Sequence, residues 1–375
     1  MRLPRIAVFV ALFAACAPAM SPEAPSPAQP PTETAGEAPQ ATPAVTLMTF
    51  NVENLFDTRD DPGKDDATYL PLAMKASDEH RAACARVSNP RWRDECLHWD
   101  WNEAIVARKL AVVGDAILQV GNGRGPDIVA LQEVENLAIL ERLVTERLAG
   151  RGYTPVLIEG DDERGIDVAF LTRLPLAAPA VLHRIEFEGV DDASEADTRG
   201  ILEATFRLPD GSLLSGFAVH FPAPFHPPSM RRDAYAALNA LAAALPDDRP
   251  AFAAGDFNTT SEEDRERHML ERFARPGWTV VHETGCGACK GTSYYPPTDS
   301  WSFLDMLLWR PAEERGDGTT WRLRPGSVAI ANQTPAQVTP DGTPARFALP
   351  AGTGVSDHWP LVAVIEPAGK QRIAF

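Results

Sequence analysis

The feature that most constrains the fold is a series of short apolar runs that end in polar side chains. Runs of this length and composition are typical of buried strands, and they occupy residues 46–52, 127–131, 166–171, 201–206, 213–219, 251–254, 303–309 and 361–365. Apolar residues recur at helical spacing over residues 105–117, 137–148 and 235–245. Strands that alternate with helices predict an α/β class.

Polar residues stand at the ends of several predicted strands. Asn51 and Glu53, Glu133, His220, and Asp256 all follow or close an apolar run. Each of them alone has an ordinary explanation as a turn residue, a helix cap or a satisfied core histidine. Their shared position favours a single site, because α/β folds collect their functional groups at strand ends.

Seven short motifs carry a family resemblance. In chain order they are Thr49-Phe50-Asn51-Val52-Glu53, Leu131-Gln132-Glu133, Val168-Ala169-Phe170-Leu171-Thr172-Arg173, Val219-His220, Gly255-Asp256-Phe257-Asn258, Phe303-Leu304-Asp305 and Ser356-Asp357-His358. This order resembles the endonuclease/exonuclease/phosphatase superfamily, which includes the pancreatic-type deoxyribonucleases, over residues 47–365. The resemblance implies a four-layer α/β sandwich with two packed mixed sheets and a site between their strand ends.

The resemblance also implies a divalent cation. Glu133 would be its main ligand, with Asp357, Glu53 and Asn51 as further members of the shell. Hard oxygen ligands select Mg²⁺, Mn²⁺ or Ca²⁺, and Mg²⁺ is the ion we expect.

The same resemblance assigns the catalytic groups. Asp256 would orient the attacking water, with Asn258 beside it. Asp305 and His358 would form a pair that favours the protonated imidazole. His220 would protonate the leaving oxygen. The alternative to Asp256 as the base is His358, as it is interpreted in some relatives. Phosphate would be bound by Asn258 and by Arg173, whose guanidinium can clamp two oxygens, although a surface role for Arg173 is the alternative.

The amino terminus predicts export. Arg2 and Arg5 precede a ten-residue apolar segment, residues 6–15, and small residues lead into Cys16. This pattern is typical of a signal, either of the lipoprotein type with lipidation at Cys16 or of the ordinary cleaved type. We expect residues 16–45 to form a flexible linker rich in Pro and Ala and residues 46–369 to form the domain that resembles the superfamily. We expect a periplasmic protein or a membrane-anchored lipoprotein, including one at the cell surface.

Residues 58–101 lose the strand and helix pattern and predict a surface excursion that contains Cys84 and Cys96. With Cys286 and Cys289 they make an even number of cysteines in an oxidising compartment, which favours disulfides. Pairing 84–96 with 286–289 is the most local of the three connectivities, and a structural zinc site is the alternative.

Two further features have an ordinary and a functional interpretation. The tryptophans of the excursion, Trp92, Trp99 and Trp101, either pack it onto the domain or stack on bases. The acidic turns at 65–66 and 161–163 either are solvated or bind calcium.

Charge bears on the substrate. The net charge is −17, and removal of residues 1–15, which hold two arginines and no acids, makes it −19. Such a surface lacks the basic footprint of a dedicated nucleic-acid binder. We expect an exported metal-dependent phosphodiesterase or endonuclease acting on DNA or RNA. The alternatives are an enzyme for phospholipids or sugar phosphates and a non-catalytic surface lipoprotein; no protein partner is inferred.

Overall fold

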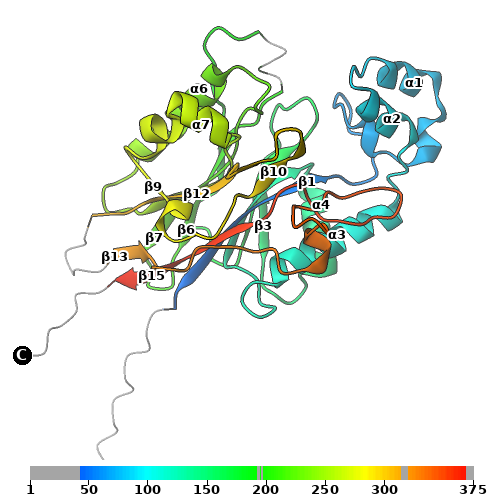
Figure 1. Ribbon diagram of the computed structural model, residues 1–375. Coiled ribbons are helices and arrows are strands. Elements are labelled where there is room, and N and C mark those ends of the chain that lie inside the picture. Colours follow the sequence, from blue (N-terminus) through cyan, green and yellow to red (C-terminus); the bar gives the residue numbers. More distant parts are fainter. Residues whose placement is uncertain (1–42, 192–194, 196, 314–319, 369–375) are drawn as a thin grey trace, which may run out of the picture. The chain divides into compact units, whose positions relative to one another are not determined.

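The computed structural model describes residues 43–191, 195, 197–313 and 320–368. The predicted export signal, the lipidation site Cys16 and nearly all of the predicted linker lie outside these residues. None of the helices described is long and apolar enough to span a membrane. The predicted α/β class and the two mixed sheets are confirmed (Figure 1).

The first sheet has seven strands in the order β13-β15-β1-β2-β4-β3, with β14 paired to β15. Their bounds are β1 Val45–Leu55, β2 Ile128–Val134, β3 Thr154–Leu157, β4 Asp167–Thr172, β13 Thr320–Leu323, β14 Ala329–Ile330 and β15 Leu361–Ala368. Strands β1 and β2 are parallel, so their carboxyl ends lie at the same edge of the sheet.

The second sheet has six strands in the order β5-β6-β7-β8-β12-β9. Their bounds are β5 Val181–His183, β6 Ile201–Arg207, β7 Leu213–His220, β8 Ala251–Asp256, β9 Thr279–Val280 and β12 Asp305–Arg310. Strands β7 and β8 form its parallel pair. A separate hairpin joins β10 (Ser293–Tyr295) to β11 (Ser300–Ser302).

Three apolar cores hold four layers together. Between the sheets, Phe170 packs edge-to-face on Phe206 and Phe252. The outer face of the first sheet packs on α3 (Glu103–Leu118) and α4 (Leu137–Arg142). The outer face of the second packs on α6 (Pro228–Ala243), and α7 (Ser261–Arg267) lies on the same side. This arrangement is the predicted four-layer sandwich (Figure 1).

The excursion at residues 58–101 is more regular than its sequence suggests. It contains α1 (Asp78–Ala85) and α2 (Pro90–His98), which begin after the capping residues Ser77 and Asn89. Neither helix has an apolar stripe, because its buried side chains are only His80 and Cys84 on α1 and Cys96 on α2. The helices therefore leave no apolar periodicity in the sequence.

Tryptophans anchor this excursion only in part. Trp101 is 1% exposed, donates its indole N–H to the carbonyl of Phe56, and packs edge-on against Tyr69. Trp99 also packs against Tyr69. Trp92, on α2, is 55% exposed, so the interpretation that it packs the excursion onto the domain does not hold for this tryptophan.

The predicted disulfide pairing is confirmed. Cys84 is bonded to Cys96, which joins α1 to α2, and Cys286 is bonded to Cys289.

Candidate active site

The strands that carry the predicted site end in unusual backbone conformations. Glu53, Asn54, Glu133 and Asn258 have φ angles of 51°, 63°, 64° and 50°. Such left-handed conformations are uncommon for residues other than glycine and concentrate at functional sites. At Glu133 the turn coincides with a register shift between Gln132 and Val134 in the pairing of β2 with β4. A bulge of this kind re-aims a side chain at the end of a strand.

Sheet register aligns three predicted catalytic residues. On β8, Asp256 lies directly between His220 on β7 and Asp305 on β12. Residues directly opposite one another across a sheet share a face. The preceding position on β8 must be glycine, because a Cβ at Gly255 would lie 1.9 Å from the carbonyl oxygen of Val219. This close approach of β7 to β8 is part of what places His220 beside Asp256.

The fourth member, His358, comes from the segment that precedes β15. Its Nδ1 lies 2.6 Å from Asp305 Oδ2, and its Nε2 lies 4.0 Å from Asp256 Oδ2. Ser356 holds this segment in place: its hydroxyl accepts from the His358 N–H and donates to the carbonyl of Asn51. The pairing expected between Asp305 and His358 is present in the structure.

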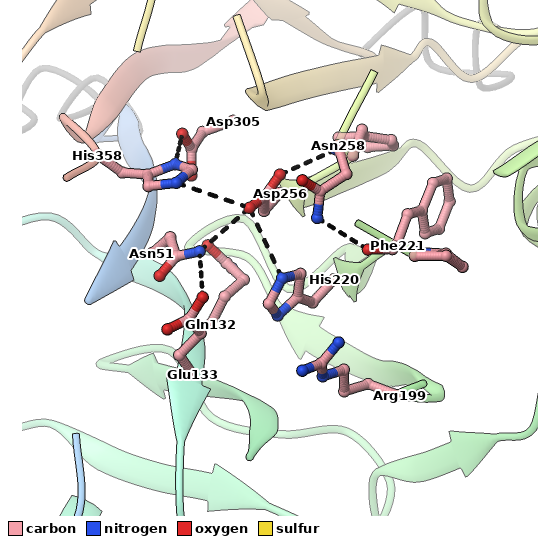
Figure 2. A network of polar contacts seen from close by, with 12 residues as sticks. Asn51, Gln132, Glu133, Arg199, His220, Phe221, Asp256, Asn258, Asp305 and His358 are labelled. Atoms are coloured by element: carbon pink, nitrogen blue, oxygen red, sulfur yellow. Dashed lines mark hydrogen bonds and ion pairs between the residues drawn. The ribbon is translucent and has the colours of Figure 1, made fainter. Parts of the chain in front are cut away.

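Asn51 joins the two sheets at the centre of the site (Figure 2). Its amide Nδ2 donates to Glu133 Oε1 and to Asp256 Oδ2, both at 3.1 Å. The other carboxylate oxygen of Glu133 accepts the backbone N–H of Asn54 at 3.0 Å. The backbone N–H of Asn258 donates to Asp256 Oδ1, and its side chain donates to the carbonyl of Phe221. Asp256 is thus held on both oxygens.

The two histidines have opposite ionisation. Burial lowers the pKa of His358, but the charges of Asp305, Asp256 and Asp357 and the hydrogen bond to Asp305 outweigh it and raise the pKa well above the ordinary value. Burial, followed by the charge of Arg199, lowers the pKa of His220 well below the ordinary value. Near neutral pH, His358 is therefore an imidazolium and His220 is neutral.

The carboxylates also differ from one another. Burial alone would raise the pKa of Glu133, but the interaction with His220, the charge of Arg164 and the hydrogen bond from Asn51 lower it to about 2. Burial raises the pKa of Asp256 to about 7 against the opposing charge of His358. Glu133 is thus ionised throughout the physiological range, whereas Asp256 can gain or lose a proton near neutrality.

The donor set fits a hard divalent cation. Glu133 supplies an ionised carboxylate, Asn51 an amide oxygen that also accepts the backbone N–H of Glu53, and Asp357 a half-exposed carboxylate. Carboxylate and amide oxygens are the ligands that Mg²⁺, Mn²⁺ and Ca²⁺ prefer. Ligand atoms of Asp256, Asp305 and His358 also lie within 4.8 Å of one another. A protonated His358 has no lone pair for a metal, which favours the group around Glu133.

Glu53 does not take the place expected for it in the metal shell. Its carboxylate accepts the Arg346 guanidinium and the backbone N–H groups of Phe347 and Asp357. The left-handed turn after Val52 directs the side chain to this segment. Glu53 therefore ties down the segment that carries Asp357, which corrects its assignment as a ligand.

The position of Arg173 does not match the phosphate-binding role that the sequence predicted. It follows β4, whose last residue pairs with the first residue of β2, at the opposite end of that strand from Glu133. Its guanidinium donates to the carbonyls of Arg124 and Gly125 and to Asp127. Because β2 and β4 are antiparallel, the end of one lies at the start of the other. These contacts hold Arg173 at the end of β2 away from Glu133, which favours the alternative interpretation of Arg173 as a structural residue.

Sequence reasoning missed two arginines of the site. Arg199, just before β6, is 5% exposed and lies beside His220 in Figure 2, with its Nε 3.1 Å from Asp162 Oδ2. Arg164 donates to the side chain of Asn54, and its charge acts on Glu133. The only sequence signal was an arginine beside a glycine just before each strand, Arg164-Gly165 and Arg199-Gly200. They give an acidic protein local positive charge.

Solved structures share this fold. D. rerio TDP2 complexed with single strand DNA product aligns with a TM-score of 0.52 and 16% identity over 86% of this chain and 99% of that one. A Bacteroides vulgatus endonuclease/exonuclease/phosphatase aligns at 0.50 and 16% over 86% and 99%. A Bacteroides thetaiotaomicron family protein aligns at 0.51 and 13% over 86% and 98%.

The comparison with curated proteins gives no match. The sequence model of the Endonuclease/Exonuclease/phosphatase family matches residues 48–358, which extend from the first core strand to the second site histidine. On that match, and with the fold and strand-end residues described above, the chain belongs to the endonuclease/exonuclease/phosphatase family.

Proposed function

We propose that this chain is a phosphodiesterase that cleaves P–O bonds by attack of water and requires a divalent cation, with Mg²⁺ the expected ion. The observation that carries the proposal is the position of Asp256, held by Asn51 and Asn258 between a neutral His220 and a protonated His358. Family members are hydrolases that act on phosphoester bonds. A binding protein would have no need for this arrangement of ionisation states.

Asp256 is suited to be the base. Its pKa of about 7 lets it accept a proton from water near neutral pH. The hydrogen bonds from Asn51 and Asn258 fix both of its oxygens, so that the water is held in one orientation. The second N–H of the Asn258 amide can donate to a phosphoryl oxygen.

The charged and polar groups around Asp256 are placed to bind the phosphate group of the substrate. The His358 imidazolium, fixed by Asp305, would donate to a phosphoryl oxygen. Neutral His220 would donate an N–H toward the leaving oxygen from the other side of Asp256. Arg199 and Arg164 add positive charge beside His220 and Glu133. When bound by Glu133, Asn51 and Asp357, the cation supplies Lewis-acid stabilisation of the phosphoryl oxygens.

Two substrate classes remain candidates. A relative of the same fold, D. rerio TDP2, was solved with a single strand DNA product, which supports a nucleic acid. The net charge of −17 supports a smaller phospholipid or sugar phosphate, because it repels a long phosphate backbone. Rates on plasmid DNA, bis-(4-nitrophenyl) phosphate and a phospholipid such as sphingomyelin, all measured at one ionic strength, distinguish the two.

We also propose that the protein is exported. Support comes from the basic and apolar segment at residues 1–15 and from two disulfides, which persist in oxidising compartments. Mass spectrometry of the mature amino terminus tests this. A lipid on Cys16 supports the anchored form, and an intact Met1 on protein purified from its native cells contradicts export.

The catalytic proposal is tested with Asp256→Asn and His358→Ala. Each should lower the turnover of bis-(4-nitrophenyl) phosphate by about 10²-fold or more, as expected for a positioned acid–base or charged group. Asp167→Asn is the matched control, because Asp167 is equally buried but accepts only the N–H of Gly160 among the hydrogen bonds described. Activity that persists in EDTA after dialysis, or folded variants that retain more than about a tenth of the parent rate, would contradict the proposal.

A further inference from the structure

A second group of carboxylates lies outside the catalytic site, where the excursion leaves β1. It consists of Asp57, Asp61, Asp66 and Glu135, which we call the acidic loop cluster. The three aspartates belong to the loop after β1, and Glu135 follows the end of β2. Hydrogen bonds join Asp57 to Glu135 and Asp61 to Asp66, and the charges of all three aspartates act on the Glu135 carboxyl group.

Two of these side chains are buried with one oxygen engaged and the other without a partner. Glu135 Oε2 accepts the backbone N–H of Asp57 at 2.6 Å, and Asp66 Oδ2 accepts that of Asp61 at 2.8 Å. Glu135 Oε1 and Asp66 Oδ1 are buried and accept no hydrogen bond from the described residues. Glu135 is 3% exposed and Asp66 is 1% exposed. Burying a carboxylate oxygen without a hydrogen-bond partner lowers the stability of the folded state.

The cluster also lacks a protein cation. Across the part of the chain that the structure describes, no side-chain nitrogen of a lysine, arginine or histidine lies within 4 Å of these four carboxylates; Asp57 Oδ1 accepts only the backbone N–H of Arg59. The basic side chain nearest in sequence to Asp66, Lys64, donates instead to the carbonyls of Gly160 and Asp162. Buried carboxylates are normally paired with a cation or coordinated to a metal.

We propose that the acidic loop cluster binds a divalent cation, Ca²⁺ in preference to Mg²⁺, and that the ion fastens the start of the excursion to the end of β2. The unpartnered oxygens of Asp66 and Glu135 are its central ligands, and Asp57 and Asp61 complete the charge around it. Ca²⁺ accepts six to eight oxygens in variable geometry, whereas Mg²⁺ demands a near-ideal octahedron. An irregular loop with several carboxylates therefore suits Ca²⁺.

Burial gives this proposal independent support. Burial, together with the charges of Asp60 and Asp61, raises the pKa of Asp66 from 3.8 to about 6 against the hydrogen bond from the Asp61 N–H. A bound cation would offset the same repulsion. The proposal does not depend on the catalytic one, because the Glu133 carboxylate faces Asn51 and Asn54 while the Glu135 carboxylate faces Asp57.

The test uses the full chain carrying Glu133→Gln, so that a cation at the catalytic site is not counted. Isothermal titration with CaCl₂ should detect one site in this parent. Its Tm should rise by roughly 3–5 °C when free Ca²⁺ exceeds the Kd about a hundredfold, and MgCl₂ should give a smaller shift. Adding Asp66→Asn and Glu135→Gln should raise the Tm in EDTA, because buried repulsion is removed, and should abolish the shift with Ca²⁺.

Asp65→Asn is the control, since it removes the same charge from an exposed neighbour of Asp66 and should leave the Ca²⁺ shift in place. An equal shift in the double variant and the control would overturn the proposal. So would a parent that shows no Ca²⁺ heat and no shift, which would mean that the cluster shares a proton instead. If the double variant does not fold, the titration of the parent decides the question alone.

Discussion

Two glutamates at the end of β2 lie two residues apart and have opposite ionisation. Burial would raise the pKa of both. At Glu133 the interaction with His220, the charge of Arg164 and the hydrogen bond from Asn51 lower the pKa to about 2, whereas at Glu135 burial and the three aspartates of the acidic loop cluster raise it to about 9. Basic side chains of the protein offset the charge of Glu133, whereas none of the described residues places a cationic side chain beside Glu135. A carboxylate's role in this protein is therefore decided by its neighbours and not by its position on the strand.

The largest effect should come from neutralising the ionised member of this pair. Glu133→Gln should lower turnover at saturating Mg²⁺ by about 10²-fold or more, because the proposed cation loses its main charged ligand. The fold should persist, since a glutamine oxygen can still accept the N–H of Asn51 or Asn54. The measurements are kcat and Tm. A folded variant with more than about a tenth of the parent rate would remove Glu133 from the mechanism.

Removing the carboxylate behind His358 should have a smaller effect with a distinct pH signature. Asp305 holds the pKa of His358 above its ordinary value. In Asp305→Asn that pKa falls, so the imidazolium, and the activity that needs it, is lost at a lower pH. We expect about a tenfold lower kcat near pH 7. The basic limb of the pH–rate profile should move to lower pH. Rates from pH 5 to 9 test this, and an unmoved basic limb would assign it to another group.

The acidic loop cluster should influence the free energy of unfolding and not the rate of turnover. The folded-state pKa of Asp66 is raised to about 6 from 3.8. Its stabilising contribution is therefore complete below about pH 4 and lost as the pH rises through 6. In EDTA the parent should lose about 1–3 kcal/mol of unfolding free energy over this range from this residue. Urea titrations of the parent and Asp66→Asn measure it, and equal pH slopes in the two proteins would contradict the assignment.

The smallest effect on turnover should come from an arginine at the far end of β2. Arg173→Gln should change kcat/KM less than about twofold, which is under 0.5 kcal/mol, because Arg173 contacts Asp127 and two carbonyls away from Glu133. Stability should fall modestly as those hydrogen bonds are lost. An increase in KM of tenfold or more with an unchanged Tm would restore the phosphate-binding role.

Sequence patterns predicted the elements that have a strong apolar signature. The runs at 46–52 and 251–254 lie within β1 and β8, because a strand buried on both faces is apolar throughout. They did not predict α1 and α2, whose sequences have almost no apolar face. The site residues at strand ends, such as Asn51, His220 and Asp256, were identifiable because the fold brings the ends of parallel strands to one edge.

The sequence by itself determined the class of fold, the family and the chemical types at the site, since these depend on local pattern and on motifs in order. Tertiary structure alone decided where each side chain points. A left-handed turn sends Glu53 to Arg346 and not to a cation. Antiparallel pairing carries Arg173 away from the site. The charge of Arg199 acts on His220 from the segment before β6. Contacts between residues far apart in sequence set orientation and ionisation, and no local pattern records them.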